Sequence, residues 1–312
     1  MAFLTLKQDV GLVGWATGGG HGYLTSEFGM GADSIIQAAV VTANSDIVTA
    51  NECQNADLLW AIRGGGGGTF GVITELTVKA HTMPQATTLL LNIEKKTNCT
   101  LCCIPPFPAV TFYGVFFLYN KPNGTMETIT EPLLELLHGA NDTAKTTSQV
   151  AWAPSWISVF DTLPSEGSAG GGGAASASRL LPDEEASKAG VSNPSIAGSM
   201  TASSVAVDNA LNPAWRETVV HLIAKESWKD SFPYTQANAA LDDMTNVKGA
   251  ALCSLAPDSG TYFNQVRKMG ELSSHDPHGV FWCKKCVGSE AWVEQLDGEL
   301  CRVADGLLAV QY

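Results

Sequence analysis

Five consecutive glycines, Gly64–Gly68, constrain the fold of this chain more than any other feature of the sequence. Before them, Asn55 precedes the run ADLLWAI, which predicts a short helix with an N-cap residue and an acid in its first turn. After them, residues 72–78 read VITELTV, a run that predicts a strand. The glycines therefore connect a helix to a strand.

The runs around this turn are typical of antiparallel strands. Val72, Leu76 and Val78 are expected on one face of a half-buried strand. Residues 37–43 (QAAVVTA) and 47–50 (IVTA) are two further β-rich runs, separated by the turn-forming residues Asn, Ser and Asp. This spacing predicts a β-hairpin.

The glycine run also contains a formal G-x-G-x-x-G match at Gly66, Gly68 and Gly71. A dinucleotide site of the Rossmann type needs the order strand, glycines, helix, because the helix N-terminus holds the pyrophosphate. Here the order is reversed, so we exclude that site. Trp60 and Phe70 bound the run with large apolar groups, which favours a packed turn over a flexible linker.

A second glycine cluster surrounds a histidine, in the order Gly18, Gly19, Gly20, His21, Gly22. Such a run removes the Cβ atoms from a stretch of backbone, so a flat or phosphorylated ligand can approach the main chain closely. The alternative is a tight turn within a sheet. A histidine in this setting is by itself more often a structural residue than a catalyst.

Composition narrows the classes of partner. The 312 residues are 45% apolar and carry a formal net charge of −13, with no basic patch beside aromatic clusters. Phosphate contacts dominate nucleic-acid affinity, so we exclude nucleic acid and expect a small-molecule partner. No run approaches the roughly 18–20 apolar residues of a membrane span, and we expect no membrane association. The N-terminus lacks the apolar core of a signal peptide.

The rest of the chain predicts a second α+β unit. Strand-like runs at 87–93, 110–119 and 217–223 flank a helical run at 131–137. A low-complexity stretch at 167–177 is expected to be a loop. The pattern favours an antiparallel sheet.

Three cysteines crowd the C-terminal region, with Cys283 and Cys286 in a C-x-x-C pair and Cys301 beyond them. Zinc needs a fourth ligand at a defined spacing, and no second C-x-x-C or H-x-x-x-H follows. We therefore expect disulfides or free thiols and no metal site.

Several of these motifs occur together in a known order. The segments GWATGGGHG, FGMGADSII, NADLLWAIRGGGGGTFGVIT and DPHGVFWCKKCVGSEAW resemble the berberine-bridge-enzyme-like flavoproteins of the vanillyl-alcohol-oxidase (PCMH-type) family, especially the fungal members. The resemblance implies an α+β chain with part of a PCMH-type FAD-binding domain in residues 1–83. It implies an antiparallel-sheet substrate domain in 84–264 and a tail in 265–312 that returns to the FAD domain.

The same resemblance implies an FAD-dependent oxidoreductase. Such an enzyme oxidises a small alcohol, sugar or secondary metabolite by hydride transfer to the flavin N5, and passes the electrons to dioxygen or another acceptor. The residues expected to line the cofactor are Gly18, Gly19, Gly20, His21, Gly22, Gly71, Val72 and Ile73. Family members are often secreted, which leaves the location of this chain open.

Two candidate catalytic residues lie on a strand-like segment near residue 260. Tyr262 and Asn264 match a G-x-Y-x-N pattern of the family, and their i, i+2 spacing places them on one side of a strand. A tyrosine acts as a base only if a nearby cation or hydrogen bonds lower its pKa from about 10. The alternative is a packed tyrosine with a satisfied hydroxyl.

The chain also departs from the family pattern. In this comparison it begins inside the FAD-binding domain, so the family's histidine that can attach to flavin has no counterpart, and His21 is not that residue. Between Asn264 and Asp276 stand only the eleven residues QVRKMGELSSH, where the family has a longer segment. The alternative function is therefore a truncated, catalytically inactive remnant that cannot hold FAD.

Overall fold

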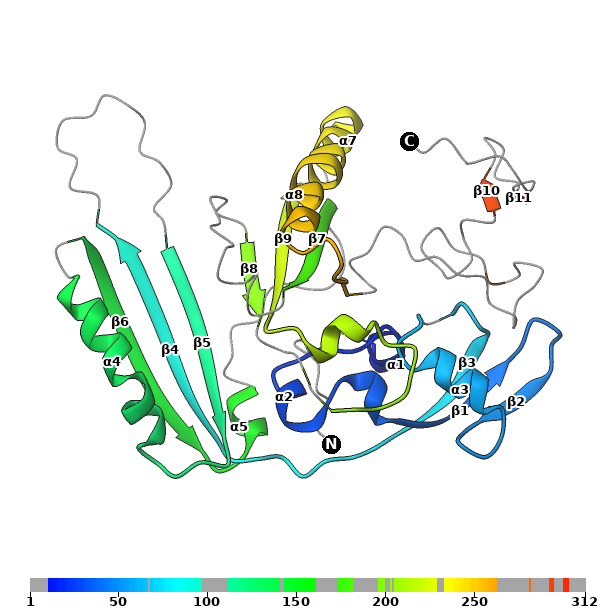
Figure 1. Cartoon of the computed structure of the whole chain (residues 1–312), viewed down its shortest axis with the longest axis horizontal. Coiled ribbons are helices and arrows are strands. Elements are labelled where there is room, and N and C mark those ends of the chain that lie inside the picture. The colour runs from blue at the N-terminus through cyan, green and yellow to red at the C-terminus, as the bar shows by residue number, and fades with distance from the viewer. Residues whose placement is uncertain are drawn as a thin grey trace. The chain divides into compact units, whose positions relative to one another are not determined.

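The computed structural model divides the chain into two compact units (Figure 1). One unit comprises Met1–Ala2 and His81–Glu166, and the other comprises Phe3–Ala80 and Gly167–Tyr312. The structure describes residues 11–66, 68–96, 111–140, 143–160, 173–181, 196–199, 203, 205–228, 233–262, 281, 292–294 and 300–302. The boundary expected after residue 264 lies outside these ranges and stays a prediction.

The larger unit contains the predicted hairpin. Strands β1 (Ile35–Val41) and β2 (Ile47–Ala50) pair antiparallel, and β3 (Val72–Val78) pairs antiparallel with the other edge of β1. The sheet order is thus β2-β1-β3. The turn closes because Thr42 N donates to Asp46 O at 2.9 Å. Both the hairpin and the strand after the glycines are confirmed.

The face of β3 differs from the expectation because the strand contains a bulge. Ala39 pairs with Glu75, whereas the next residue of β1, Val40, pairs with Ile73. The extra residue reverses the alternation of side chains. Ile73 therefore packs against the core on the same side as Leu76 and Val78. Val72 is 54% exposed, so the predicted face was wrong at this residue.

Two short helices cover this sheet. They are α1 (Leu12–Thr17) and α3 (Ala56–Ile62), and α3 begins directly after Asn55 as predicted. The buried residues that form the common core are Trp15, Ala16, Ile35, Ala38, Val40, Ala50, Leu58, Leu59, Ala61, Ile62 and Phe70. Most of the apolar residues of α3 are therefore used by the core.

The glycine run is a packed turn, as the flanking aromatic residues predicted. Gly64 has φ +100°, and a Cβ there would lie 2.7 Å from Leu211 Cα. Gly71 has φ +149°, and its Cβ would lie 2.5 Å from a methyl carbon of Val40. Gly66 N donates to Thr17 O at 3.1 Å. Close backbone packing, together with the left-handed φ values, thus explains Gly64 and Gly71. At Gly68 the φ value of +81° alone favours glycine, because a Cβ there would meet nothing within 4 Å, and Gly67 lies outside the described residues.

A second antiparallel sheet in the same unit has the order β7-β9-β8. Its strands are β7 (Gly173–Leu181), β9 (Val220–Trp228) and β8 (Ile196–Ser199). The expected loop at 167–177 was wrong for residues 173–177, which belong to β7. Pairing with β9, remote in sequence, makes a strand of a segment whose small residues carry little strand signal.

A long helical segment packs on this second sheet. It consists of α7 (Tyr234–Asp243), a π-helical segment η3 (Met244–Gly249) and α8 (Ala250–Leu255). The buried residues that join it to the sheet are Leu222, Ala224, Met244, Leu252 and Ala256. The remaining short elements of this unit are α2 (Thr25–Phe28), η1 (Gly31–Ser34), η2 (Pro213–Arg216) and the antiparallel pair β10 (Trp292–Glu294) and β11 (Leu300–Arg302).

The smaller unit is a three-stranded antiparallel sheet with two helices. Its strands β4 (Ala86–Lys95), β5 (Thr111–Tyr119) and β6 (Ala144–Ala153) are ordered β5-β4-β6. The helices are α4 (Thr125–Gly139) and α5 (Trp156–Phe160). The strands predicted at 87–93 and 110–119 and the helix at 131–137 are confirmed. Among the described helices, none is long and apolar enough to cross a bilayer.

Candidate functional site

The glycine-histidine loop, residues 18–22, follows α1 directly and is buried along its whole length. Gly19 and Gly20 have φ values of +117° and +71°, which side-chain-bearing residues rarely adopt. Their carbonyls accept hydrogen bonds from Ala32 N at 2.9 Å and Gly31 N at 2.7 Å. The loop is therefore fixed against η1.

The space that the missing Cβ atoms leave is filled by the chain itself. A Cβ on Gly20 would lie 2.9 Å from Gly31 Cα and 3.1 Å from the Trp15 ring. A Cβ on Gly19 would lie 2.9 Å from a methyl carbon of Leu211 and 3.7 Å from the Tyr262 ring. Close packing within the protein accounts for these two glycines.

His21 lies at the centre of an aromatic cluster. Its ring stacks on Trp215 with a centroid distance of 5.5 Å and an interplanar angle of 22°. His221 and Tyr262 approach it edge-on, with centroid distances of 4.8 and 4.6 Å. In addition, Trp15 Nε1 donates to the His21 carbonyl at 2.9 Å. The cluster thus joins residues that are more than 240 positions apart.

The electrostatics of the cluster keep His21 neutral. Burial, and to a smaller extent charge repulsion from the neighbouring His221, lowers its pKa to about 3. The side chain is 5% exposed. Its Nδ1 atom is buried and has no hydrogen-bond partner among the residues that the structure describes. It is therefore a polar atom that a ligand or a water molecule could satisfy.

Tyr262 is the one predicted catalytic residue that the structure describes. Its side chain is 6% exposed, and its hydroxyl donates to Trp15 O over a long distance of 3.5 Å. Both this residue and His21 were singled out from the sequence, and the structure brings their rings into contact. Asn264 lies outside the described residues, as do Cys283 and Cys286.

The second group of predicted cofactor residues lies at the start of β3. Gly71 is buried against β1, Ile73 is half-buried on the core side, and Val72 is largely exposed. Phe70, directly before them, belongs to the same core cluster as Trp15, which supports the glycine-histidine loop. Both groups of predicted cofactor residues therefore border the hydrophobic core that contains Trp15 and Phe70.

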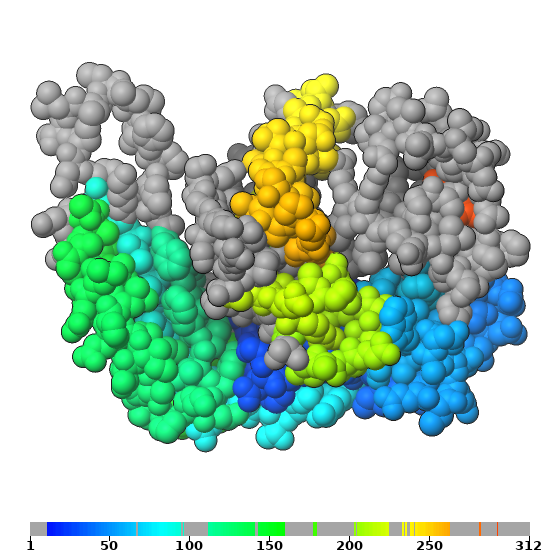
Figure 2. Space-filling view, in the orientation of Figure 1, coloured from blue at the N-terminus to red at the C-terminus, as the bar shows by residue number. Residues whose placement is uncertain are grey.

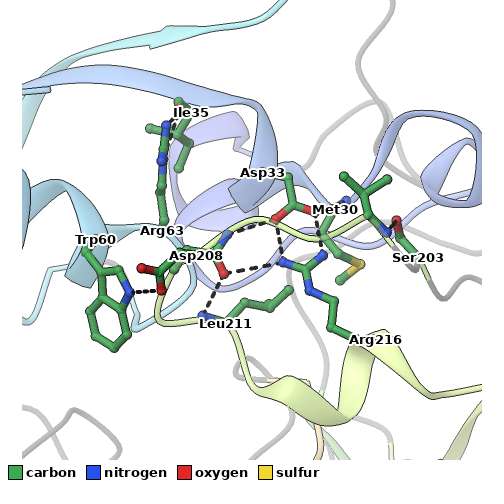
Figure 3. Close-up of polar contacts among 11 residues, drawn as sticks. Met30, Asp33, Ile35, Trp60, Arg63, Ser203, Asp208, Leu211 and Arg216 are labelled. Atoms are coloured by element: carbon green, nitrogen blue, oxygen red, sulfur yellow. Dashed lines mark hydrogen bonds and ion pairs between the residues drawn. The ribbon is translucent and has the colours of Figure 1, made fainter. Parts of the chain in front are cut away.

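A buried ion pair joins η1 to η2, the short helix that contributes Trp215 to the cluster. Arg216 Nη1 and Nη2 donate to Asp33 Oδ2 and Oδ1 at 2.8 and 2.7 Å (Figure 3). The same carboxylate accepts from Asn209 Nδ2 at 2.8 Å and Met30 N at 2.9 Å. Its side chain is 3% exposed. A carboxylate with four donors is held in one orientation.

The chain around residue 208 also runs along α3. Trp60 Nε1 donates to Asp208 Oδ1 at 2.8 Å (Figure 3). In addition, Ala210 N donates to Trp60 O at 3.2 Å. Figure 2 shows residues 205–216 (yellow-green) at the surface beside the N-terminal elements (blue). These contacts connect the segment before η2 to α3, the helix that packs on the first sheet.

Sequence reasoning missed five residues of this arrangement, namely Asp33, Asn209, Trp215, Arg216 and His221. Asp33 stands in the motif FGMGADSII, and Arg216, its partner, is 183 positions away. A single sequence carries no signal that pairs such residues. The aromatic character of Trp215 was the only available hint of burial.

Solved structures that are similar to this chain include flavoproteins. The chain superposes on the VAO-type flavoprotein MtVAO713 of Myceliophthora thermophila C1 with a TM-score of 0.80 and 23% identity, covering 97% of this chain and 65% of that one. It also matches the glucooligosaccharide oxidase of Acremonium strictum, with a TM-score of 0.61, 20% identity, and coverage of 90% and 68%. The fold is thus that of the VAO-type flavoproteins, an α+β fold with antiparallel sheets.

Sequence relatives agree with this assignment. The FAD-linked oxidoreductase apf9 of Gibberella fujikuroi is 30% identical over 370 residues, which cover 93% of this chain and 62% of the relative. The FAD-linked oxidoreductase sor8 of Hypocrea jecorina is 30% identical over 350 residues, with coverage of 95% and 60%. No family model matches the chain. The chain is similar in sequence to these fungal FAD-linked oxidoreductases and spans about three fifths of their length.

Proposed function

We propose that this protein binds FAD and oxidises a small molecule. The observation that carries the proposal is the 30% identity, over 93% of the chain, to a fungal FAD-linked oxidoreductase. The VAO-type flavoprotein fold supports it independently. We exclude a Rossmann-type nicotinamide site because the glycines at 64–68 follow a helix and precede a strand.

The residues proposed to hold FAD are the main chain of 18–22 and the start of β3, residues 71–73. One feature of the structure fits a bound group at the loop, since His21 Nδ1 is buried and lacks a partner among the described residues. A neutral imidazole can donate one hydrogen bond and accept another. Exposed Val72 offers apolar contact at the second place.

When bound, FAD supplies the acceptor for a hydride from a substrate C–H bond. The chain itself must then accept the proton of the substrate O–H or N–H group. We propose Tyr262 Oη for this step, with Asn264 as a second candidate. His21 is neutral at physiological pH and supplies no cation to activate Tyr262, so another cation or hydrogen bonds to the phenolate would have to do so.

The proposed substrate class is a small alcohol, a sugar or a secondary metabolite. Several solved structures with this fold are named as oligosaccharide oxidases, one of them as a xylooligosaccharide oxidase in complex with xylobiose. That likeness favours a carbohydrate among the three classes. The electron acceptor is proposed to be dioxygen or another small oxidant.

A second candidate function is favoured by the packing of the loop. The positions freed at Gly19 and Gly20 are occupied by Leu211, Tyr262, Gly31 and Trp15. These glycines serve the fold even if no ligand binds. On this alternative, the chain is a family member that does not hold FAD.

A visible absorption spectrum of the purified chain separates the two candidates. Flavin absorbance that moves to the supernatant after acid precipitation supports noncovalent binding, and colour that stays in the pellet indicates covalent attachment. If the protein is colourless, FAD is added and its fluorescence quenching is titrated at pH 7.5. A protein that stays colourless and does not quench FAD refutes the proposal and supports the alternative.

A further inference from the structure

Two consecutive residues of β7, Ser178 and Arg179, hold the short segment that follows α8. Arg179 Nε donates to the Ala256 carbonyl at 2.7 Å, and Arg179 Nη2 donates to the Pro257 carbonyl at 2.6 Å. A few residues later, the hydroxyl groups of Ser178 and Thr261 share a hydrogen bond of 2.7 Å. Both ends of this segment are thus attached to one strand.

The two attachment points lie on opposite faces of the sheet, because consecutive side chains of a strand alternate between its faces. Arg179 pairs with Leu222 of β9, which belongs to the core beneath η3 and α8 (Figure 1). Ser178 shares the other face with Leu180, whose partner on β9 is His221. The segment after α8 therefore crosses from the helix-covered face of the sheet to the face of His221.

This crossing brings Tyr262 into the aromatic cluster. The Tyr262 ring centroid lies 4.6 Å from that of His21 and 6.2 Å from that of Trp215. Just before it, Gly260 packs so closely on Asn212 that a Cβ at Gly260 would lie 2.1 Å from Asn212 Nδ2. Asn212 is the N-cap residue of η2. The path of the segment is therefore fixed by β7 and by η2 before it reaches the tyrosine.

Arg179 is the stronger of the two attachment points. The residue is 8% exposed, and its Nη1 also lies 3.9 Å from Cys253 Sγ. Its guanidinium binds the carbonyls at the C-terminal end of α8, where the helix dipole favours a cation. Hydrogen bonds from a charged donor are roughly twice as strong as those between neutral groups. Loss of the guanidinium would therefore free the turn after α8 more than loss of the Ser178 hydroxyl.

We propose that Arg179 is a positioning residue for Tyr262. By fixing the turn at Ala256 and Pro257, it sets the place of the Tyr262 side chain against the glycine-histidine loop, and Ser178 assists from the opposite face of the sheet. Arg179 thereby acts on the proposed proton transfer through Tyr262 and without contact with substrate or flavin. The effect on catalysis rests on the proposed function, whereas the placement of Tyr262 does not.

The placement is tested without FAD or substrate. The full chain is labelled with 3-fluorotyrosine, and the fluorine NMR signal of Tyr262 is identified by its loss in Tyr262→Phe. In the folded wild type, the rings of His21 and Trp215 shift this signal through their ring currents. We expect Arg179→Met to move it toward its position in the urea-unfolded chain. Arg179→Lys should move it less, because a lysine can still donate to a carbonyl. An unmoved signal in Arg179→Met overturns the proposal.

Arg63→Met is the matched control. Arg63 also donates from Nε and Nη2 to a main-chain carbonyl, that of Ile35, at 2.9 and 2.6 Å, and its side chain is 12% exposed (Figure 3). These bonds hold the start of β1 and not the segment after α8. We expect both substitutions to lower stability, and the control to leave the Tyr262 signal in place. Movement of equal size in the two variants would indicate a general loosening of the unit and overturns the proposal.

Two milder variants cover the case in which Arg179→Met does not fold. Ser178→Ala and Thr261→Val each remove one hydroxyl from the same hydrogen bond and leave the guanidinium in place. We expect both to move the Tyr262 signal in the same direction as Arg179→Lys, and by similar amounts to each other. A signal that stays at its wild-type position in these two variants and in Arg179→Lys overturns the proposal.

The effect on catalysis is measured on the FAD-loaded chain, with xylobiose as the probe substrate. Arg179→Met should slow flavin reduction by about 10- to 100-fold, because a displacement of about 1 Å can cost that much, with a smaller effect on KM. In the Tyr262→Phe background the same substitution should have little further effect, since groups that act as a unit are not additive. Equal slowing in both backgrounds overturns the positioning role. If xylobiose does not reduce the wild-type flavin, the proposed carbohydrate class is contradicted, and the fluorine signal decides the placement alone.

Discussion

Arg216 and Asp33, 183 residues apart, form a two-point ion pair with N–O distances of 2.7 and 2.8 Å. The pair connects η2, which carries Trp215, to η1, which supports the glycine-histidine loop. The carboxylate is almost fully buried and the guanidinium is 20% exposed. The first prediction concerns this pair.

Removal of the guanidinium leaves Asp33 buried with two donors fewer. Breaking a buried pair costs about 3–5 kcal/mol, and the partial exposure of Arg216 places the expected loss for Arg216→Ala near the lower end, at about 3 kcal/mol. Urea unfolding measures it. The control is Lys248→Ala, which removes the more exposed pair of Lys248 with Asp243 and should cost under about 1 kcal/mol. Equal losses in the two variants would contradict the structural role of the buried pair.

Gly20 and Gly14 test the packing of the loop. At Gly20, φ is +71° and a Cβ would lie 2.9 Å from Gly31 Cα, whereas at Gly14, within α1, a Cβ would meet nothing within 4 Å. We expect Gly20→Ala to destabilise the fold by about 1–3 kcal/mol. Gly14→Ala should stabilise it by roughly 0.5–1 kcal/mol, because alanine is the better helix former. Thermal unfolding of both variants checks the difference in sign, and a neutral Gly20→Ala would argue against the close approach.

The bulge in β3 is tested by two neighbouring substitutions. Ile73 packs on the core, so we expect Ile73→Ala to cost about 2 kcal/mol, the low end for deletion of a large aliphatic side chain. Val72 is 54% exposed, so Val72→Ala should cost under about 0.5 kcal/mol. The free energies of unfolding in urea give the comparison. The reverse order would mean that β3 follows the regular alternation and has no bulge.

Tyr262→Phe separates packing from chemistry. The ring contacts with His21 are kept, and the hydroxyl, which donates to Trp15 O at 3.5 Å, is removed. We expect the free energy of unfolding to change by under about 1.5 kcal/mol. If Tyr262 accepts the substrate proton, turnover of the FAD-loaded protein should fall by about 100-fold or more. Flavin reduction by substrate, followed at several pH values, measures this, and an unchanged rate would assign Tyr262 to packing alone.

Local patterns were sufficient for the first sheet. Asn55, an apolar run and then glycines correctly predicted α3 and the turn, because a helix of this length and a glycine turn are set by nearby residues. The hairpin of β1 and β2 followed from alternation and three turn residues. By contrast, the side of β3 on which Val72 lies could not be predicted, since a bulge depends on the register with β1.

For the candidate site, the sequence named Gly18 to Gly22 and Tyr262 through motifs, but it could not reveal that His21 and Tyr262 touch. It gave no indication of His221 or of the ion pair of Asp33 with Arg216. These contacts form only when β9 and η2 pack on the glycine-histidine loop. The strand at 173–177 was likewise hidden, because its alanines and serines form a strand only when β9 pairs with them.

The sequence by itself determined the α+β class, the helix-glycine-strand order and the likeness to FAD-linked oxidoreductases, because each depends on residues that are neighbours in the chain. The tertiary structure decided which remote side chains share a buried environment. Burial, and with it the neutrality of His21, arises from contacts that four distant segments make together. Such contacts depend on the packed arrangement as a whole, and they produce no pattern in the sequence from which they could be predicted.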